Sequence, residues 1–142
     1  MFFKNNKIFF VFLFRFKQLY NYTSYGIPTK YGQKYFVSIR EPEQNQAIIY
    51  SLESLSGETK IFLDPNNLSS DGTISLKFTA FSNNGKYCAY GISKGGSDWT
   101  RIRIKNVDTL EDLSDELIKV KFSNIAWSSN NDGFFYAVSF LF

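Results

Sequence analysis

Residues 78–90, FTAFSNNGKYCAY, predict two antiparallel β-strands joined by a tight turn. Residues 82–85, SNNG, would form the turn, because glycine tolerates a positive φ and asparagine side chains bond readily to nearby backbone groups. Aromatic and small apolar residues on both sides of the turn are typical of packed strands. The assignment of the fold then depends on whether this hairpin pattern recurs along the chain.

A second copy of the pattern lies near the end of the chain. Residues 80–85, AFSNNG, and 126–133, AWSSNNDG, share an Ala-aromatic-Ser strand end before the turn. Gly32 also precedes an aromatic strand, so that the turn glycines Gly32, Gly85 and Gly133 are 53 and 48 residues apart. A repeat of about 50 residues with about four short strands per unit is typical of β-propeller blades. A β-sandwich is the alternative that the strand pattern leaves open.

The expected strands are short apolar stretches between turn residues. They cover residues 34–40, 46–52, 60–63, 76–81, 86–92, 100–107 and 118–122. Alternation is clearest in TRIRIKNV, where Ile102 and Ile104 would face one side and the intervening basic residues the other. Residues 108–119, DTLEDLSDELIK, are acidic and have helical propensity, so we expect a loop with one helical turn there.

These strands predict an all-β chain built from antiparallel four-stranded blades. Residues 24–64 would supply the later strands of one blade, residues 76–122 a whole blade, and residues 124–138 the first two strands of a third. About two and a half blades cannot close a ring, and open blades leave apolar faces in water. We therefore expect the chain to be a piece of a larger propeller.

Residue counts exclude several kinds of site. The chain has no histidine, so a Ser-His-Asp triad, a Cys-His pair and an HExxH zinc site are excluded within it. We expect no metal site and no cofactor. Cys88 is the only cysteine, which excludes an internal disulfide and favours a reducing, cytoplasmic location.

The charge distribution and the N-terminal stretch argue against nucleic acid and membrane partners. The 16 basic and 13 acidic residues are scattered, so no continuous basic surface for nucleic acid is predicted. Residues 8–14, IFFVFLF, resemble a signal-peptide core, which makes secretion the alternative to a cytoplasmic location. Arg15 and Lys17 interrupt that run, however, and it is far shorter than the roughly 20 apolar residues of a membrane span.

Six short stretches, in the same order, resemble the propeller domain of the prolyl oligopeptidase family. They are FLDPN at 62–66, LSSDGT at 68–73, AFS at 80–82, AYG at 89–91, GGSDW at 95–99, and VKFS at 120–123 followed by AW at 126–127. The resemblance extends over residues 15–137. We accordingly divide the chain into an atypical N-terminal segment (1–14), a partial β-propeller domain (15–138) and an atypical C-terminal tail (139–142).

The resemblance implies a role in a serine peptidase. In that family a seven-bladed propeller covers an α/β-hydrolase domain that carries the Ser, Asp and His triad, and the enzymes cleave short peptides after proline. The triad has no counterpart in this chain. The resemblance therefore implies a substrate-gating propeller segment that is inactive alone, with proline-containing peptides and the hydrolase domain of the same parent chain as partners. A propeller that only binds other proteins is the alternative, although neither the WD nor the Kelch pattern is matched.

The resemblance also implies two substrate-binding positions. Phe122 matches an aromatic residue that projects into the substrate pocket and contacts the peptide upstream of proline. Asp98 matches an acidic residue near the hydrolase interface that influences substrate electrostatics. Blade packing for Phe122 and a turn-capping role for Asp98 are the structural alternatives. Trp99 is expected to be a packing neighbour rather than a substrate contact.

Overall fold

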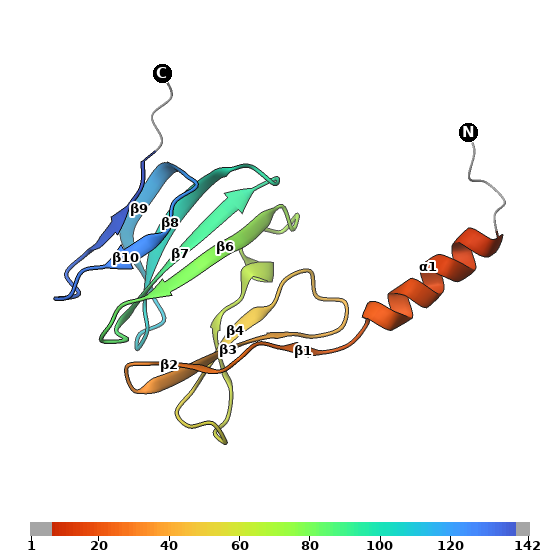
Figure 1. Cartoon of the computed structure of the whole chain (residues 1–142), viewed down its shortest axis with the longest axis horizontal. Coiled ribbons are helices and arrows are strands. Elements are labelled where there is room, and N and C mark those ends of the chain that lie inside the picture. Colours follow the sequence, from red (N-terminus) through yellow and green to blue (C-terminus); the bar gives the residue numbers. More distant parts are fainter. Residues whose placement is uncertain (1–6, 139–142) are drawn as a thin grey trace.

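A computed structural model describes residues 7–138, and within them one helix precedes three antiparallel sheets (Figure 1). The helix is α1 (Lys7–Tyr20), and the first sheet contains β1 (Ser24–Tyr25), β2 (Thr29–Tyr31), β3 (Lys34–Arg40), β4 (Ile48–Leu52) and β5 (Lys60–Leu63). A 3-10 turn, η1 (Pro65–Asn67), leads to the second sheet, which contains β6 (Ile74–Phe81), β7 (Tyr87–Lys94), β8 (Trp99–Asn106) and β9 (Asp112–Lys121). The third sheet is the pair β10 (Ile125–Trp127) and β11 (Phe134–Tyr136).

The first two sheets each have four strand positions, which confirms the predicted blade pattern. The second sheet has the order β6-β7-β8-β9, and the first has the order β1-β3-β4-β5 with β2 also paired to β3. β1 pairs with the end of β3 at Arg40 and β2 with its beginning at Lys34, so both occupy one edge of the first sheet. The first sheet is therefore a full unit, and the prediction that residues 24–64 hold only the later strands of a blade was wrong.

The sequence prediction was also wrong for residues 108–119. This stretch forms most of β9, which pairs with β8 from Trp99↔Lys121 to Lys105↔Asp112. Two interruptions of the register accompany the pairing, as β-bulges do in exposed edge strands. Cross-strand ion pairs with β8 favour the strand, since Glu116 contacts Arg103 at 2.9 Å and Asp112 contacts Lys105 at 2.9 Å.

Apolar side chains from both faces of β7 hold the three sheets together. Cys88, Tyr90 and Ile92 pack toward the first sheet, in a core that includes Phe36 and Phe62. Ala89, the next residue along β7 after Cys88, packs on the other face with partly buried side chains of β10 and β11. A sheet that is buried on both faces between two neighbouring sheets is the arrangement expected of a propeller blade.

The turns at one end of the sheets, which we call the turn end, contact one another directly. Ser82 and Ser128 occupy equivalent positions, because each backbone N–H donates to a carbonyl five residues later, that of Tyr87 at 2.8 Å and that of Gly133 at 2.9 Å. By this equivalence the partner of Gly85 (φ +71) is Asn131 (φ 62), which differs from the predicted match of Gly85 with Gly133. Asparagine takes the place of glycine there because it tolerates the left-handed region.

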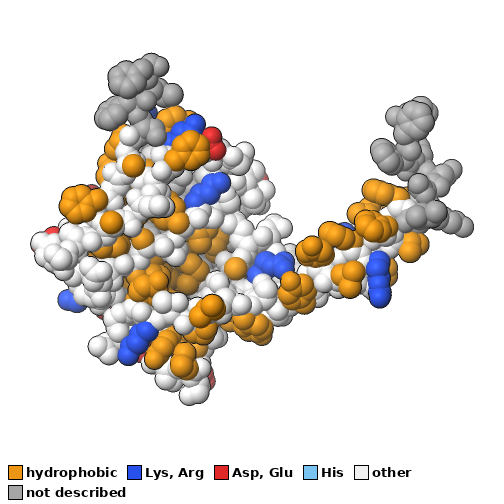
Figure 2. Space-filling view, in the orientation of Figure 1, with side chains coloured by type: hydrophobic (Ala, Val, Ile, Leu, Met, Phe, Trp, Pro, Cys, Tyr) orange, Lys and Arg blue, Asp and Glu red, His pale blue; other side chains and the backbone are white. Residues whose placement is uncertain are grey.

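Helix α1 extends away from the three sheets in Figure 1. Its apolar side chains are exposed, including Phe10, Phe12 and Phe14 at 62–65% exposure. Figure 2 shows hydrophobic side chains along the helix surface. Within residues 7–138, no helix is both long and apolar enough to cross a bilayer. The helix continues across residue 14, so the predicted domain boundary there stays a prediction, and the predicted tail at 139–142 lies outside the described residues.

Candidate functional site

The pairing of β8 with β9 brings the two predicted site residues together. Trp99 at the start of β8 lies opposite Lys121 at the end of β9. Asp98 directly precedes Trp99 and Phe122 directly follows Lys121, so both lie one position beyond this pair. We call these four residues the Asp98–Phe122 cluster, and it stands at the end of the second sheet opposite the turn end.

Lys121 connects the members of the cluster. Its ammonium nitrogen lies 3.3 Å from Oδ2 of Asp98, which makes an ion pair. The same nitrogen lies 4.9 Å from the ring centre of Phe122 and 5.6 Å from the ring of Trp99. These distances are within the range of cation–π attraction. Lys121 therefore holds the carboxylate and the two rings close to one another.

Phe122 is 79% exposed, unlike the phenylalanines of the first two sheets but similar to Phe135 of β11, which is 73% exposed. Its backbone is left-handed, with φ 51, a region that phenylalanine seldom occupies. Within residues 7–138 the ring packs in neither apolar core, and both the substrate contact and the alternative of blade packing stay predictions.

Among residues 7–138, hydrogen bonds of Gly95 and Ser97, and not of Asp98, hold the loop before Asp98. Gly95 and Gly96 both have positive φ, and the Gly95 N–H donates to the Thr73 carbonyl at 2.9 Å. The side chain of Ser97 accepts a hydrogen bond from the Trp99 N–H at 3.1 Å, which is the capping role considered for Asp98. The Asp98 carboxylate is thereby left to interact with Lys121.

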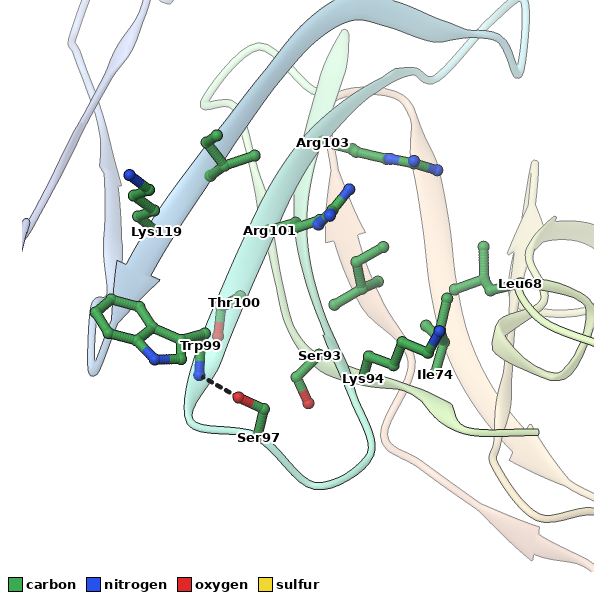
Figure 3. Close-up of a pocket in the computed structure, with 12 residues that line it drawn as sticks. Leu68, Ile74, Ser93, Lys94, Ser97, Trp99, Thr100, Arg101, Arg103 and Lys119 are labelled. Carbon is green, nitrogen blue, oxygen red and sulfur yellow. Dashed lines mark hydrogen bonds between the residues drawn. The ribbon is translucent and has the colours of Figure 1, made fainter. Parts of the chain in front are cut away.

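A hollow of about 950 Å³ adjoins the cluster through Trp99 (Figure 3). Its lining combines apolar and cationic side chains, and none of the lining residues is acidic. The cations are Lys94, Arg101, Arg103 and Lys119, and the apolar part is formed by Leu68, Ile74, Ile92, Trp99 and Ile118. We call this space the basic hollow. Sequence analysis missed it because its residues come from four separate segments.

A hydrogen-bonded network stabilises the sheet beside the basic hollow. The hydroxyl of Tyr90 donates to Asp112 at 2.8 Å. Burial, together with this bond to Asp112, raises the pKa of Tyr90 well above its ordinary value. The pKa of Arg103 is also raised, mainly because its side chain donates to Glu116. Tyr90 therefore stays neutral and Arg103 stays charged near neutral pH, and the bond to Glu116 at 2.9 Å fixes the position of Arg103.

The part of the chain that the structure describes offers no metal centre, since no three His, Cys, Asp or Glu side chains gather there. Cys88 is buried as a free thiol, and burial raises its pKa to about 12. A thiol with so high a pKa is a poor nucleophile. Neither feature adds a reactive group to the Asp98–Phe122 cluster.

Comparison with known proteins identifies the domain. Residues 13–139 match the family model described as the prolyl oligopeptidase N-terminal β-propeller domain. The chain is 40% identical over 119 residues to a prolyl endopeptidase of Elizabethkingia meningoseptica, covering 84% of this chain and 17% of that enzyme. It is 46% identical over 99 residues to prolyl oligopeptidase A of Amanita bisporigera, covering 61% of this chain and 13% of the relative.

Solved structures agree with this assignment. A prolyl endopeptidase superposes with a TM-score of 0.83 at 30% identity, over 89% of this chain and 19% of its own. Prolyl oligopeptidase B of Galerina marginata, bound to a 35mer hydrolysis and macrocyclization substrate, superposes with a TM-score of 0.85 at 25% identity, over 92% of this chain and 21% of its own. The chain thus spans 13–21% of the length of these relatives, and it belongs to the prolyl oligopeptidase family, in which it matches the N-terminal β-propeller domain.

Proposed function

We propose that this chain is part of the substrate-gating propeller of a proline-specific serine endopeptidase. The Ser, Asp and His of the catalytic triad belong to a separate α/β-hydrolase domain of the parent chain in this proposal. The absence of histidine from the sequence supports this division, because the segment cannot supply the general base of a triad. The segment alone is therefore expected to have no peptidase activity.

The observation that supports this function best is the exposed ring of Phe122 in the Asp98–Phe122 cluster. An exposed aromatic ring held beside an ion pair suits the recognition of an apolar group next to polar backbone. In the proposed complex, Phe122 contacts the peptide residue upstream of the proline. Asp98 lies near the hydrolase domain and influences the electrostatic field that the substrate meets.

A chimeric enzyme tests the proposal. Residues 24–137 would replace the corresponding segment of the prolyl endopeptidase of Elizabethkingia meningoseptica, whose identity to this chain is 40%. We expect the chimera to cleave a fluorogenic proline-containing peptide. The change Phe122→Ala should lower kcat/KM about tenfold or more, since an aromatic contact to substrate contributes more than 1 kcal/mol.

Leu110→Ala is the matched control. Leu110 also has a positive φ, of 60, and is 44% exposed, but it lies at the turn end of the same pair of strands. The control should leave kcat/KM unchanged. Equal kcat/KM values for Phe122→Ala and the unchanged chimera would contradict the substrate role of Phe122.

The proposed location is the cytoplasm. Cys88 is a free, buried thiol, which suits a reducing compartment. Fractionation of cells that make the parent protein, with detection by an antibody against this segment, checks the location. Recovery of the protein from the secreted fraction would contradict it.

A further inference from the structure

We propose that the basic hollow binds acidic segments of peptides. This proposal rests on the proposed function, because the peptide is taken to be a long substrate that contacts Phe122 and continues over Trp99. Trp99 belongs both to the Asp98–Phe122 cluster and to the lining of the hollow, so the two sites are continuous. The substrate class would be proline-containing peptides with glutamate or aspartate residues at a distance from the proline.

The charges around the hollow favour a carboxylate ligand. Arg101 and Arg103 share a single carboxylate, that of Glu116, at 3.5 Å and 2.9 Å. No ion pair joins Lys94 or Lys119 to a carboxylate among residues 7–138. Arg103 also borders the acids Asp112, Asp115 and Glu116, so the unpaired positive charge of the hollow, within the part of the chain that the structure describes, lies at Lys94 and Lys119.

A second acid lies near Lys94 but is engaged elsewhere. The Asp71 carboxylate accepts hydrogen bonds from the Thr73 backbone and hydroxyl at 3.1 Å and 2.8 Å. These bonds lower the pKa of Asp71 more than the charge of Lys94 does. Asp71 and Lys94 form no ion pair among residues 7–138, and the two charges attract one another only at longer range.

The shape and the chemistry of the walls suit a peptide. Figure 3 shows Arg101 and Arg103 projecting from the same side of β8, with Lys94 extending across the hollow toward Ile74. Carboxylates would bind the guanidinium groups with charge-assisted hydrogen bonds, and methylene groups would lie against the apolar walls. A volume of about 950 Å³ is at the upper end of the range for ligand pockets, so several residues fit.

A relative binds long peptides. Prolyl oligopeptidase B of Galerina marginata has been solved with a 25mer and a 35mer substrate. Such peptides extend far beyond the residues next to a cleaved bond. A subsite at some distance from Phe122 could therefore contact them.

Binding to the 142-residue chain tests the proposal without any catalysis. The probes are acetylated, amidated tetraglutamate and tetraglutamine, titrated while the indole NMR signal of Trp99 is followed. Trp127, the other tryptophan, packs on the opposite face of the second sheet and serves as an internal reference. We expect tetraglutamate to shift Trp99 selectively and to bind about tenfold more tightly than tetraglutamine, with the difference lost in 0.5 M salt.

Two variants separate the hollow from general charge effects. The double change Lys94→Gln and Arg101→Gln should weaken tetraglutamate binding about tenfold, since each exposed charge contributes modestly. Lys86→Gln, an exposed lysine at the turn end, should leave it unchanged. If the double variant loses its fold by circular dichroism, Arg101→Gln alone is used, because this side chain is 62% exposed.

The outcomes distinguish this proposal from the proposed function. Equal affinity for both tetrapeptides would overturn the acidic-peptide subsite. So would a loss of tetraglutamate affinity in Lys86→Gln equal to that in the double variant. Inorganic phosphate that binds as tightly as tetraglutamate would also overturn it, since the site would then be a general anion site. A chimera that cleaves short neutral peptides while showing no preference for acidic long ones would overturn the subsite and leave the proposed function standing. A chimera that cleaves no peptide, in combination with selective binding of tetraglutamate by the chain, would overturn the proposed function. It would leave the binding of acidic peptides by the hollow standing.

Discussion

The two ends of the second sheet differ in what their residues contact. At the turn end, backbone groups of neighbouring sheets touch one another, and the Asn84 N–H donates to the side chain of Asn131 at 3.1 Å. At the other end, the Asp98–Phe122 cluster makes its contacts within one sheet and exposes its aromatic ring. The opposite end also joins two sheets, because Gln46 donates to the Ile74 carbonyl and accepts from the Leu76 N–H, both at 2.8 Å. The difference teaches that the cluster, unlike the turns and Gln46, does not join the sheets, which leaves the cluster available for ligands.

The largest expected effect concerns the two kinds of phenylalanine. Phe36 is 4% exposed and its ring lies 4.3 Å from that of Phe81, whereas Phe122 is 79% exposed. Phe36→Ala should lower the free energy of unfolding by about 3–5 kcal/mol, and Phe122→Ala by less than about 0.5 kcal/mol. Urea denaturation of the 142-residue chain, followed by circular dichroism, measures both. Similar losses would show that the cluster also supports the fold.

Two glycines with positive φ give the next contrast. A Cβ at Gly85 would lie 2.6 Å from the Gly32 nitrogen, whereas a Cβ at Gly95 would meet no atom within 4 Å. Gly85→Ala should lower the free energy of unfolding by about 2–3 kcal/mol, through backbone strain and a clash of the new Cβ with the Gly32 backbone. Gly95→Ala should lower it by about 1 kcal/mol, through strain alone. The same urea measurement compares them. Equal costs would mean that the turns of neighbouring sheets are not in close contact.

Asn131 tests the equivalence of the turns. Asn131→Ala should lower stability by about 1–2 kcal/mol, because it removes the acceptor for the Asn84 N–H and strains a left-handed residue. Asn131→Gly relieves the strain and loses only the side-chain hydrogen bonds to Asn84 and Ser129, so its cost should be about half as large. Thermal unfolding distinguishes the two variants. A glycine variant less stable than the alanine variant would contradict the equivalence with Gly85.

The smallest effect is expected for Lys121. Lys121→Gln removes an ion pair whose Asp98 side chain is 58% exposed, so the unfolding free energy should fall by no more than about 0.5 kcal/mol. The chemical shifts of the Trp99 indole should nevertheless change, since the cation leaves its ring. Unchanged Trp99 shifts in the variant would rule out the connecting role of Lys121. Asp98→Asn is the matched variant, because it removes the other charge of the same ion pair.

Much of the second sheet could be predicted from the sequence. The hairpin at residues 82–85 and the strand alternation at Ile102 follow from local chemistry, namely glycine at positive φ and a period of two. β9 could not be predicted in this way. Its leucine, glutamate and lysine residues favour a helix when considered alone, and only pairing with the arginines of β8 makes the strand stable.

The candidate site was predictable only in part. Asp98 and Phe122 were identified from the resemblance to a family, and their positions are 24 residues apart in the sequence. The register that sets Trp99 opposite Lys121 brings them together, and register depends on bulges that local patterns do not reveal. The basic hollow needs the connector near Leu68 to lie against the second sheet, which is a long-range contact.

The left-handed backbone of Phe122 has a consequence for how this chain can change over time. A non-glycine residue in that conformation costs about 1 kcal/mol, and a large exposed ring offsets little of it, through its contact with Lys121 alone among the contacts described above. Variants selected only for folded protein should therefore accumulate glycine or asparagine at position 122. Variants selected for peptide cleavage should keep phenylalanine, so the residue recovered at this one position reports which of the two properties was under selection.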